Sequence, residues 1–242
     1  MADAIFEEPR LAEIYDPLDP DRFDLDAYAA LAGEFGAVTV LDVGCGTGTL
    51  ACLLAARGLE VIAADPAAAS LQVAGRKPGA GGVRWVQADA AALPPLQVDL
   101  ATMTGNVAQV FVADQEWAAA LRAVRAALRP GGRLVFESRD PGKRAWLEWN
   151  RDQTYRRVVI PEVGPVQTWT DLTDAGGSVV SFRMTFVFGS DGAVLTSDST
   201  LRFRSREELA DSLIAADLVV EEVRDAPDRP GREFVFIARR AV

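Results

Sequence analysis

The sequence contains no histidine among its 242 residues. Without an imidazole, Ser-His-Asp and Cys-His catalysis is excluded, together with histidine-containing metal sites. Cysteine is almost as scarce, because Cys45 and Cys52 are the only two. Their spacing across a predicted helix start separates them by roughly 10 Å, which is too far for a disulfide. We therefore expect free thiols, no metal site and a reducing, cytoplasmic location.

Positive charge and long apolar runs are also scarce. The 25 basic and 35 acidic residues give a net charge of −10, which disfavours nucleic acids and anionic membrane surfaces as partners. The first eight residues contain no basic segment followed by an apolar one, so we expect no signal peptide. We also expect no membrane span, because the least charged window is explained better as a strand and a helix.

The most informative stretch runs from residue 38 to residue 56. Its first part, Val38 to Val43, is apolar and β-branched, which is typical of a strand buried on both faces. Gly44, Gly46 and Gly48 follow, and leucines at helical spacing come next. A strand, a glycine turn and a helix N-terminus bring bare backbone N–H groups up to a ligand. The alternative is a tight turn whose glycines serve packing alone.

The identity of this ligand is narrowed by what the turn does not contain. A dinucleotide fingerprint, G-x-G-x-x-G, needs a glycine where the chain has Thr49 or Ala51. A phosphate loop needs a lysine, and residues 38–56 contain no basic side chain. The turn carries the carboxylate of Asp42 instead, which favours a positively charged ligand without phosphate. S-adenosylmethionine has these properties.

The segment Leu41-Asp-Val-Gly-Cys-Gly-Thr-Gly48 resembles the first motif of the class I S-adenosylmethionine-dependent methyltransferases, here of the small-molecule type. The resemblance covers residues 38–139 and roughly 205–239. It implies S-adenosylmethionine as the cofactor, with the glycine turn beneath its methionine part. The acid at the position of Asp42 orients the cofactor's amino group in that family.

Later positions extend the resemblance. Asp65 ends the second predicted strand, where a carboxylate can accept both ribose hydroxyls; the alternative is a helix cap before Pro66. Asp89 and Ala90 match the family's adenine-binding motif. In that family a tyrosine near Tyr15 can touch the cofactor, and the alternative is a packed or exposed aromatic. The predicted cofactor-binding residues are Tyr15, Asp42, Gly44, Cys45, Gly46, Gly48, Asp65, Pro66, Asp89, Ala90 and Thr104.

Five strand–helix alternations end near residue 139 and predict an α/β fold with a doubly wound, mostly parallel sheet. The resemblance adds two final strands, and so seven in all, with an antiparallel edge. We expect a cofactor-binding core over residues 1–140 and 205–242, in which residues 1–36 form a helical cap that opens with a polar segment to Pro20. The predicted cap helix, residues 22–35, has Phe23, Tyr28, Leu31 and Phe35 as core contacts.

Residues 141–204 differ in pattern and predict an inserted antiparallel subdomain after the fifth strand, which opens with a short helix over residues 141–150. Some small-molecule methyltransferases carry such an insert over the site, and in some it mediates dimers. The resemblance therefore allows a homodimer through the insert. Asn106, Arg139, Trp146 and Trp149 are the predicted substrate-binding residues; the alternative for the tryptophans is packing of the insert onto the core. No catalytic residue is predicted.

Together these features predict methyl transfer to a small-molecule acceptor. An amine or a carboxylate is favoured over a hydroxyl, because a hydroxyl usually needs a histidine base or a metal. A nucleic-acid methyltransferase is disfavoured by the acidic charge and by Thr104-Gly-Asn-Val107, where such enzymes often carry an Asn/Asp-Pro-Pro-aromatic motif. Two alternatives remain open: an NAD(P)-dependent oxidoreductase and a non-catalytic S-adenosylmethionine-binding module.

Overall fold

The structure, a computed structural model, describes residues 2–242. Its larger sheet has seven strands in the order β10-β11-β5-β4-β1-β2-β3. The pairs among β1 to β5 are parallel, and β11 runs antiparallel to both β5 and β10. The doubly wound, mostly parallel sheet is therefore confirmed. The strands are β1 (Thr39–Val43), β2 (Glu60–Asp65), β3 (Val83–Gln87), β4 (Val98–Met103), β5 (Leu128–Arg139), β10 (Leu218–Asp225) and β11 (Glu233–Arg240).

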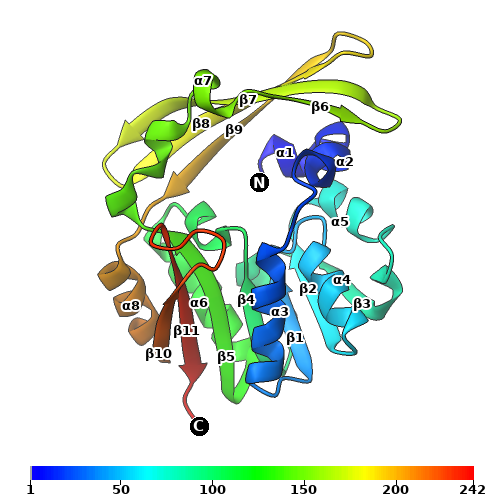
Figure 1. Cartoon of the computed structure of the whole chain (residues 1–242). Coiled ribbons are helices and arrows are strands. Elements are labelled where there is room, and N and C mark those ends of the chain that lie inside the picture. Colours follow the sequence, from blue (N-terminus) through cyan, green and yellow to red (C-terminus); the bar gives the residue numbers. More distant parts are fainter. Residues whose placement is uncertain (1) are drawn as a thin grey trace.

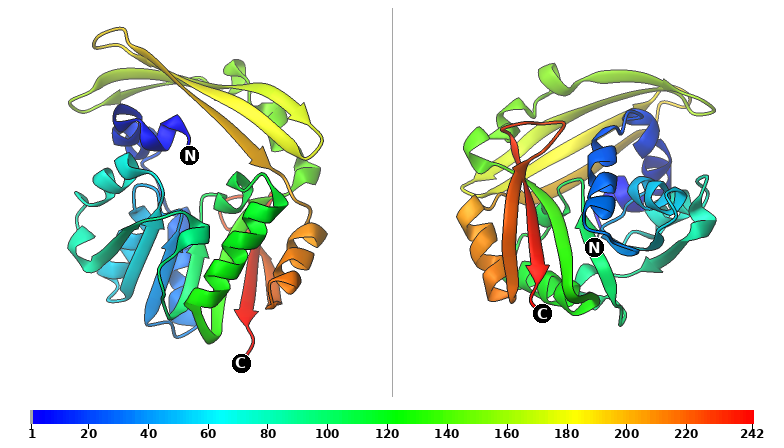
Figure 2. Two further views of the ribbon diagram at one scale, coloured as in Figure 1. Left: turned by 180° about the vertical axis from the view of Figure 1, so that it is seen from behind. Right: turned by 60° about the horizontal axis from the view of Figure 1, so that its bottom comes forward.

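Helices cover both faces of this sheet (Figures 1 and 2). On one face, α3 (Asp24–Glu34) and α4 (Thr49–Ala56) bury apolar side chains against β1 and β2. On the other face, α6 (Asp114–Ala127) and α8 (Arg206–Ala215) pack against β1, β4 and β5. Helix α5 (Ala68–Ala74) connects β2 to β3. Because both faces of the sheet are covered, all five residues of β1 are buried, including the polar Thr39 and Asp42.

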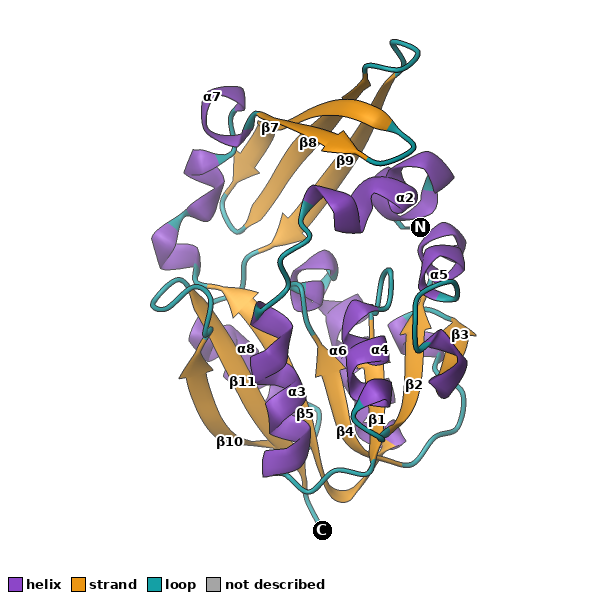
Figure 3. Ribbon diagram, turned by 45° about the vertical axis from the view of Figure 1, so that its right-hand side comes forward, coloured by secondary structure: helices purple, strands orange, loops and turns teal. Residues whose placement is uncertain are grey.

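The insert forms a second sheet, antiparallel throughout, with the order β6-β7-β8-β9. In Figure 3 the arrows of β1, β2 and β4 point toward it, so it lies beyond the carboxyl ends of these strands. An antiparallel insert after the fifth strand is thus confirmed, while its boundary as a separate subdomain stays a prediction. Its strands are β6 (Arg156–Ile160), β7 (Gly164–Gly176), β8 (Val179–Phe188) and β9 (Val194–Arg202).

The first twenty residues fold differently from the sequence-based expectation of a polar segment. They form α1 (Ala4–Glu7) and α2 (Pro9–Leu18), and Glu8 caps α2 by accepting the Arg10 backbone N–H. Apolar side chains of both helices pack on the insert sheet, so the two helices lie between that sheet and the core (Figure 1). The buried members of this cluster are Ile5, Leu11, Ile14, Leu18, Ile160, Val166, Phe186 and Phe188.

Two further expectations need correction. Phe23 is 63% exposed, because α3 begins only at Asp24 and leaves Phe23 before the helix; Tyr28 and Leu31 are buried as expected. Residues 141–150, expected as a short helix, form the 3-10 turns η4 (Pro141–Lys143) and η5 (Ala145–Glu148), which precede α7 (Arg151–Thr154). No helix within residues 2–242 is both long and apolar enough to cross a membrane.

Candidate active site

The three glycines of the turn after β1 serve two different purposes. All three have positive φ, at 69°, 53° and 77° for Gly44, Gly46 and Gly48. A Cβ on Gly44 would lie 2.6 Å from the Val107 side chain, and one on Gly48 would lie 2.4 Å from the Trp85 ring. These two glycines are required by packing. A Cβ on Gly46 would meet nothing within 4 Å, so the space beside this residue is open to a ligand.

Asp65 connects the end of β2 to this turn. Its Oδ2 accepts the Gly46 N–H at 2.8 Å, and its Oδ1 accepts the Ala67 N–H at 2.8 Å. Burial raises the pKa of the Asp65 carboxyl, which is only 7% exposed. The carboxylate therefore holds the glycine turn and shapes the entry to α5, and its contact with a ribose stays a prediction.

Asp42 lies under the turn in the middle of the sheet. Its Oδ1 accepts the Thr102 hydroxyl at 2.8 Å. Burial raises the pKa of Asp42 to about 7, and the charge of Asp65 adds to the effect. A cation placed beside Asp42 would favour its ionised form and lower this pKa.

Two residues that the sequence analysis missed, Asp16 and Lys77, tie α2 to the glycine turn. Asp16 Oδ1 accepts the Thr47 hydroxyl at 2.8 Å, and Asp16 Oδ2 lies 2.7 Å from Lys77 Nζ. Lys77 Nζ also donates to the Thr49 hydroxyl at 2.6 Å. Lys77 follows α5 and so lies outside residues 38–56, where the absence of basic side chains was noted.

The loop after β4 is held by a buried carboxylate that the sequence analysis also missed. Gly105 and Asn106 have φ values of 71° and 62°, and both backbone N–H groups donate to Glu137 Oε1, at 2.6 and 3.1 Å. The Tyr28 hydroxyl donates to Glu137 Oε2. Burial, together with the charge of nearby Glu233, raises the pKa of Glu137 to about 7. A glutamate directly after the apolar run of β5 was the available signal.

Asn106 is clamped a second time through its side chain. Its Nδ2 donates to Glu233 Oε2 at 3.1 Å, and Glu233 Oε1 lies 2.7 Å from Arg229 Nη1 and 3.7 Å from Arg139 Nε. Because Glu233 Oε2 accepts this bond from the Asn106 amide nitrogen, the contact fixes the orientation of the amide. Asn106 Oδ1 has no hydrogen-bond partner among the described residues. Two predicted substrate residues, Asn106 and Arg139, thus meet around Glu233.

A cavity of about 360 Å³ opens between α2, the loop after β4, the carboxyl end of β5 and the insert. Tyr15, Asn106 and Arg139 line it, and burial raises the pKa of the Tyr15 hydroxyl. The lining has more acidic than basic groups. Its acids are Asp16, Asp19, Asp21, Asp24, Glu137, Asp228 and Glu233, and its arginines are Arg22, Arg139, Arg156 and Arg229.

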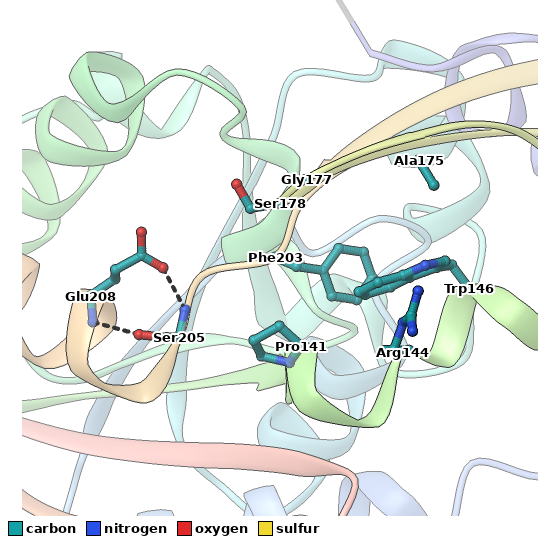
Figure 4. Close-up of a pocket in the computed structure, with 9 residues that line it drawn as sticks. All are labelled: Pro141, Arg144, Trp146, Ala175, Gly177, Ser178, Phe203, Ser205 and Glu208. Carbon is teal, nitrogen blue, oxygen red and sulfur yellow. Dashed lines mark hydrogen bonds between the residues drawn. The ribbon is translucent and has the colours of Figure 1, made fainter.

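The two predicted tryptophans lie elsewhere. Trp146 packs on Phe203 and Trp149 packs on Phe182, both with ring centroids 4.6 Å apart, and neither tryptophan lines this cavity. Trp146 borders a second, open hollow with Arg144 beside it (Figure 4). These contacts favour the packing alternative, and the substrate role of the tryptophans stays a prediction.

The remaining predicted cofactor residues lie at or near the carboxyl ends of β1 to β4. Cys45 is half-buried in the glycine turn, and burial raises the pKa of its thiol well above the usual value. Asp89 Oδ1 accepts the Ala91 N–H at 2.9 Å, so it already shapes a local turn, and Ala90 is buried. The Pro66 carbonyl accepts a bond from Gln87 Nε2 at 3.3 Å. Cofactor contacts of these residues and of Thr104 stay predictions.

Comparison with known proteins agrees with this arrangement. The family model described as a methyltransferase domain matches residues 40–132, from β1 into β5. A cypemycin N-terminal methyltransferase from Streptomyces sp is 34% identical over 106 residues, 43% of each chain. A ubiquinone biosynthesis O-methyltransferase from Chromobacterium violaceum is 35% identical over 136 residues, 54% of this chain and 55% of that one. The chain spans about half the length of these curated relatives.

The likeness in fold extends over nearly the whole chain. A sugar N-methyltransferase from Streptoalloteichus sp superposes with a TM-score of 0.78 at 21% identity, covering 95% of this chain and 92% of the other. Residues 40–132 therefore match a methyltransferase domain, and the chain as a whole shares the fold of a solved S-adenosylmethionine-type methyltransferase. No group of three or more metal-ligating side chains lies together among residues 2–242.

Proposed function

We propose that this methyltransferase transfers the methyl group of S-adenosylmethionine to an amine of a small molecule. The observation that carries the proposal is the charged cavity beside Gly105 and Asn106, at the carboxyl ends of β4 and β5. Ligands of doubly wound sheets bind at such strand ends. The cavity volume of about 360 Å³ suits a metabolite, and its seven carboxyl groups against four arginines favour an acceptor with a positively charged or hydrogen-donating end.

The residues around the glycine turn fit the cofactor. Gly46 leaves open space beside the turn, and Asp65, already ordered by two backbone N–H groups, stands where a ribose would lie. Asp42, with its raised pKa, suits a neighbouring ammonium group. When bound, S-adenosylmethionine supplies a methyl group already activated by the sulfonium charge. The residues of the chain therefore have to bind the cofactor and the acceptor, orient them toward each other and exclude water.

The cavity residues can hold the acceptor in a fixed position relative to the cofactor. Glu137 holds the loop of Gly105 and Asn106, and Glu233 holds the Asn106 side chain. Orientation of two reactants can contribute about 7–11 kcal/mol to lowering a barrier. Glu137 accepts three hydrogen bonds, two of them from this loop, so we assign it to holding the loop rather than to acting as the base that a hydroxyl acceptor needs. An amine with a free lone pair needs no such base.

The names of similar proteins give further support to transfer to nitrogen. One curated relative is named for N-terminal methylation and one similar structure for sugar N-methylation, whereas the other relative is an O-methyltransferase. The net charge of −10 supports our further inference of no nucleic-acid partner, and the two free cysteines support that of a cytoplasmic location. A homodimer through the insert remains part of the proposal.

The test is incubation with trideuteromethyl S-adenosylmethionine and panels of amines, carboxylates and hydroxyl compounds, with and without EDTA. We expect labelled N-methyl products, unaffected by EDTA, and loss of labelling in the Asp65→Ala variant. Hydroxyl-methylated products, or activity abolished by EDTA and restored by magnesium, would contradict the proposal. Binding of NAD in place of S-adenosylhomocysteine would favour an oxidoreductase, and cofactor binding without any transfer would favour a non-catalytic module.

A further inference from the structure

One arginine of the cavity differs from the others in its partners. Arg22 lies 3.1 Å from Asp24, Arg229 lies 2.7 Å from Glu233, and Arg139 lies 3.7 Å from Glu233. Arg156 has no carboxylate within 4.0 Å among residues 2–242. It is the one cavity arginine in the described chain whose charge is not matched by a neighbouring acid.

The position of Arg156 is nevertheless defined. It begins β6, pairs with Thr168 of β7 and lines the cavity from the insert side, across from Gly105 and Asn106 on the core side. Its Nη1 donates to the Leu18 carbonyl at 3.3 Å, at the C-terminal end of α2. This single bond holds the guanidinium at the cavity and leaves its other N–H groups available.

A free guanidinium in an otherwise acidic lining has a specific chemical consequence. Its planar set of donors matches a carboxylate or a phosphate. A purely cationic acceptor would be repelled by Arg156, whereas an acceptor with an anionic end would pair with it.

We propose that Arg156 determines specificity by binding an anionic group, a carboxylate or a phosphate, of the acceptor. The amine of the same molecule then lies at the core end of the cavity, beside Asn106. The acceptor class is thus an amine that also carries an acid group at its distal end. The inference rests on the proposed function for the role of the amine, but the anion contact can be measured without turnover.

The neighbouring residue provides a matched control. Arg157 is also an exposed arginine of β6, but successive strand residues point to opposite faces, and Arg157 does not line the cavity. Replacing either arginine by glutamine removes one positive charge from the same strand. Only the Arg156 change removes it from the cavity.

The experiment uses three amines of similar length: 5-aminopentanoate, 4-aminobutyl phosphate and 5-aminopentan-1-ol. Binding to the whole protein with saturating S-adenosylhomocysteine is measured by calorimetry, and transfer is measured with labelled cofactor. We expect the wild-type protein to prefer one of the anionic probes over the alcohol by at least about tenfold. Arg156→Gln should remove this preference, Arg156→Lys should retain part of it, and Arg157→Gln should leave it intact.

Three outcomes would overturn the inference, and a fourth would refute only the proposed function. No preference for either anionic probe in the wild type would show that Arg156 does not select an acid group. Equal losses in the Arg156→Gln and Arg157→Gln variants would indicate a general surface potential. Weakened S-adenosylhomocysteine binding in Arg156→Gln would assign the anion to the cofactor's own carboxylate. Anion binding without methylation of any amine would refute the proposed function and leave the Arg156 contact standing.

Discussion

The two sides of the cavity are built differently. On the core side, Glu137 accepts three hydrogen bonds and Glu233 contacts two arginines and Asn106, so these groups are fixed before any ligand arrives. On the insert side, Arg156 keeps a single carbonyl contact beside the flexible side chain of Met184. A reacting group needs a rigid environment, whereas the choice of an acceptor tolerates an adaptable one. We therefore propose that the core positions the reacting groups and that the insert selects the substrate.

The largest expected effects separate folding from ligand binding within the core. Gly48→Val places a branched side chain against Trp85 at a left-handed position, and should lower the free energy of unfolding by about 3 kcal/mol or more. Gly46→Val meets no protein atom and should cost only about 1–2 kcal/mol of strain, yet it should abolish S-adenosylhomocysteine binding. Urea denaturation and calorimetry measure the two effects. Normal binding by Gly46→Val would show that the open space is not the cofactor's.

Asp65→Ala should have the next largest effect. It removes the acceptor for the Gly46 and Ala67 N–H groups and for the predicted ribose contact. Charge-assisted hydrogen bonds contribute about 1.5–3 kcal/mol each, so cofactor affinity should fall at least about tenfold. Asp65→Asn, which keeps an acceptor oxygen but loses the charge, should show a smaller loss. Unchanged calorimetric affinity in a folded Asp65→Ala protein would rule out the ribose assignment.

The raised pKa of Asp42, about 7, predicts pH-dependent cofactor binding. An ammonium group beside Asp42 favours the ionised carboxylate, so binding should release a proton and tighten by up to about tenfold from pH 6 to pH 8. Calorimetry in buffers of different ionisation enthalpy counts the protons. Asp42→Asn should bind with little pH dependence over this range. A wild-type affinity that is flat with pH would place the cofactor's amino group elsewhere.

The same pKa shift has a consequence for stability without ligand. Because the pKa of Asp42 is higher in the folded than in the unfolded protein, its stabilising contribution is complete below about pH 4. That contribution is lost as the pH rises toward the folded value of about 7. The free energy of unfolding should therefore fall over this range more steeply in the wild type than in Asp42→Asn. Parallel curves from denaturant titrations would contradict the buried environment of Asp42.

The smallest effect concerns the tie between α2 and the glycine turn. Lys77→Met removes the contacts to Asp16 and Thr49 and should cost about 1 kcal/mol. Amide hydrogen exchange should quicken in α2, which lies against the insert. The control is Arg57→Met. It breaks only the solvent-exposed ion pair between Arg57 and Asp26, 2.7 Å apart, which does not involve α2. Equal exchange in both variants would show that Lys77 does not join the glycine turn to α2.

The core could be predicted from the sequence because its signals are local. Short apolar runs alternate with helical periodicity, and Asp42 and Asp65 follow from their places in β1 and at the end of β2. The cavity could not be predicted in the same way. Glu233 reaches the site only because β11 pairs with β5, which places it opposite Arg139, almost a hundred residues earlier in the chain.

The first twenty residues show a second limit. Leu11, Ile14 and Leu18 have helical spacing, but acids and prolines between them make the segment read as polar. This apolar face is buried only because the insert sheet, more than 130 residues later in the chain, packs against it. Long-range packing of this kind leaves no local signal, which is why Asp16 and Arg156 escaped notice.

The most direct test of the account is to offer one acceptor that contains an amine, a hydroxyl and a distal acid group, together with trideuteromethyl S-adenosylmethionine. Tandem mass spectrometry of the product then locates the label within a single molecule. The account predicts the label on nitrogen, in wild type and in the Arg157→Gln variant, with much less product from Arg156→Gln. A label on the hydroxyl or carboxyl oxygen would contradict the central proposal, which is methyl transfer to an amine.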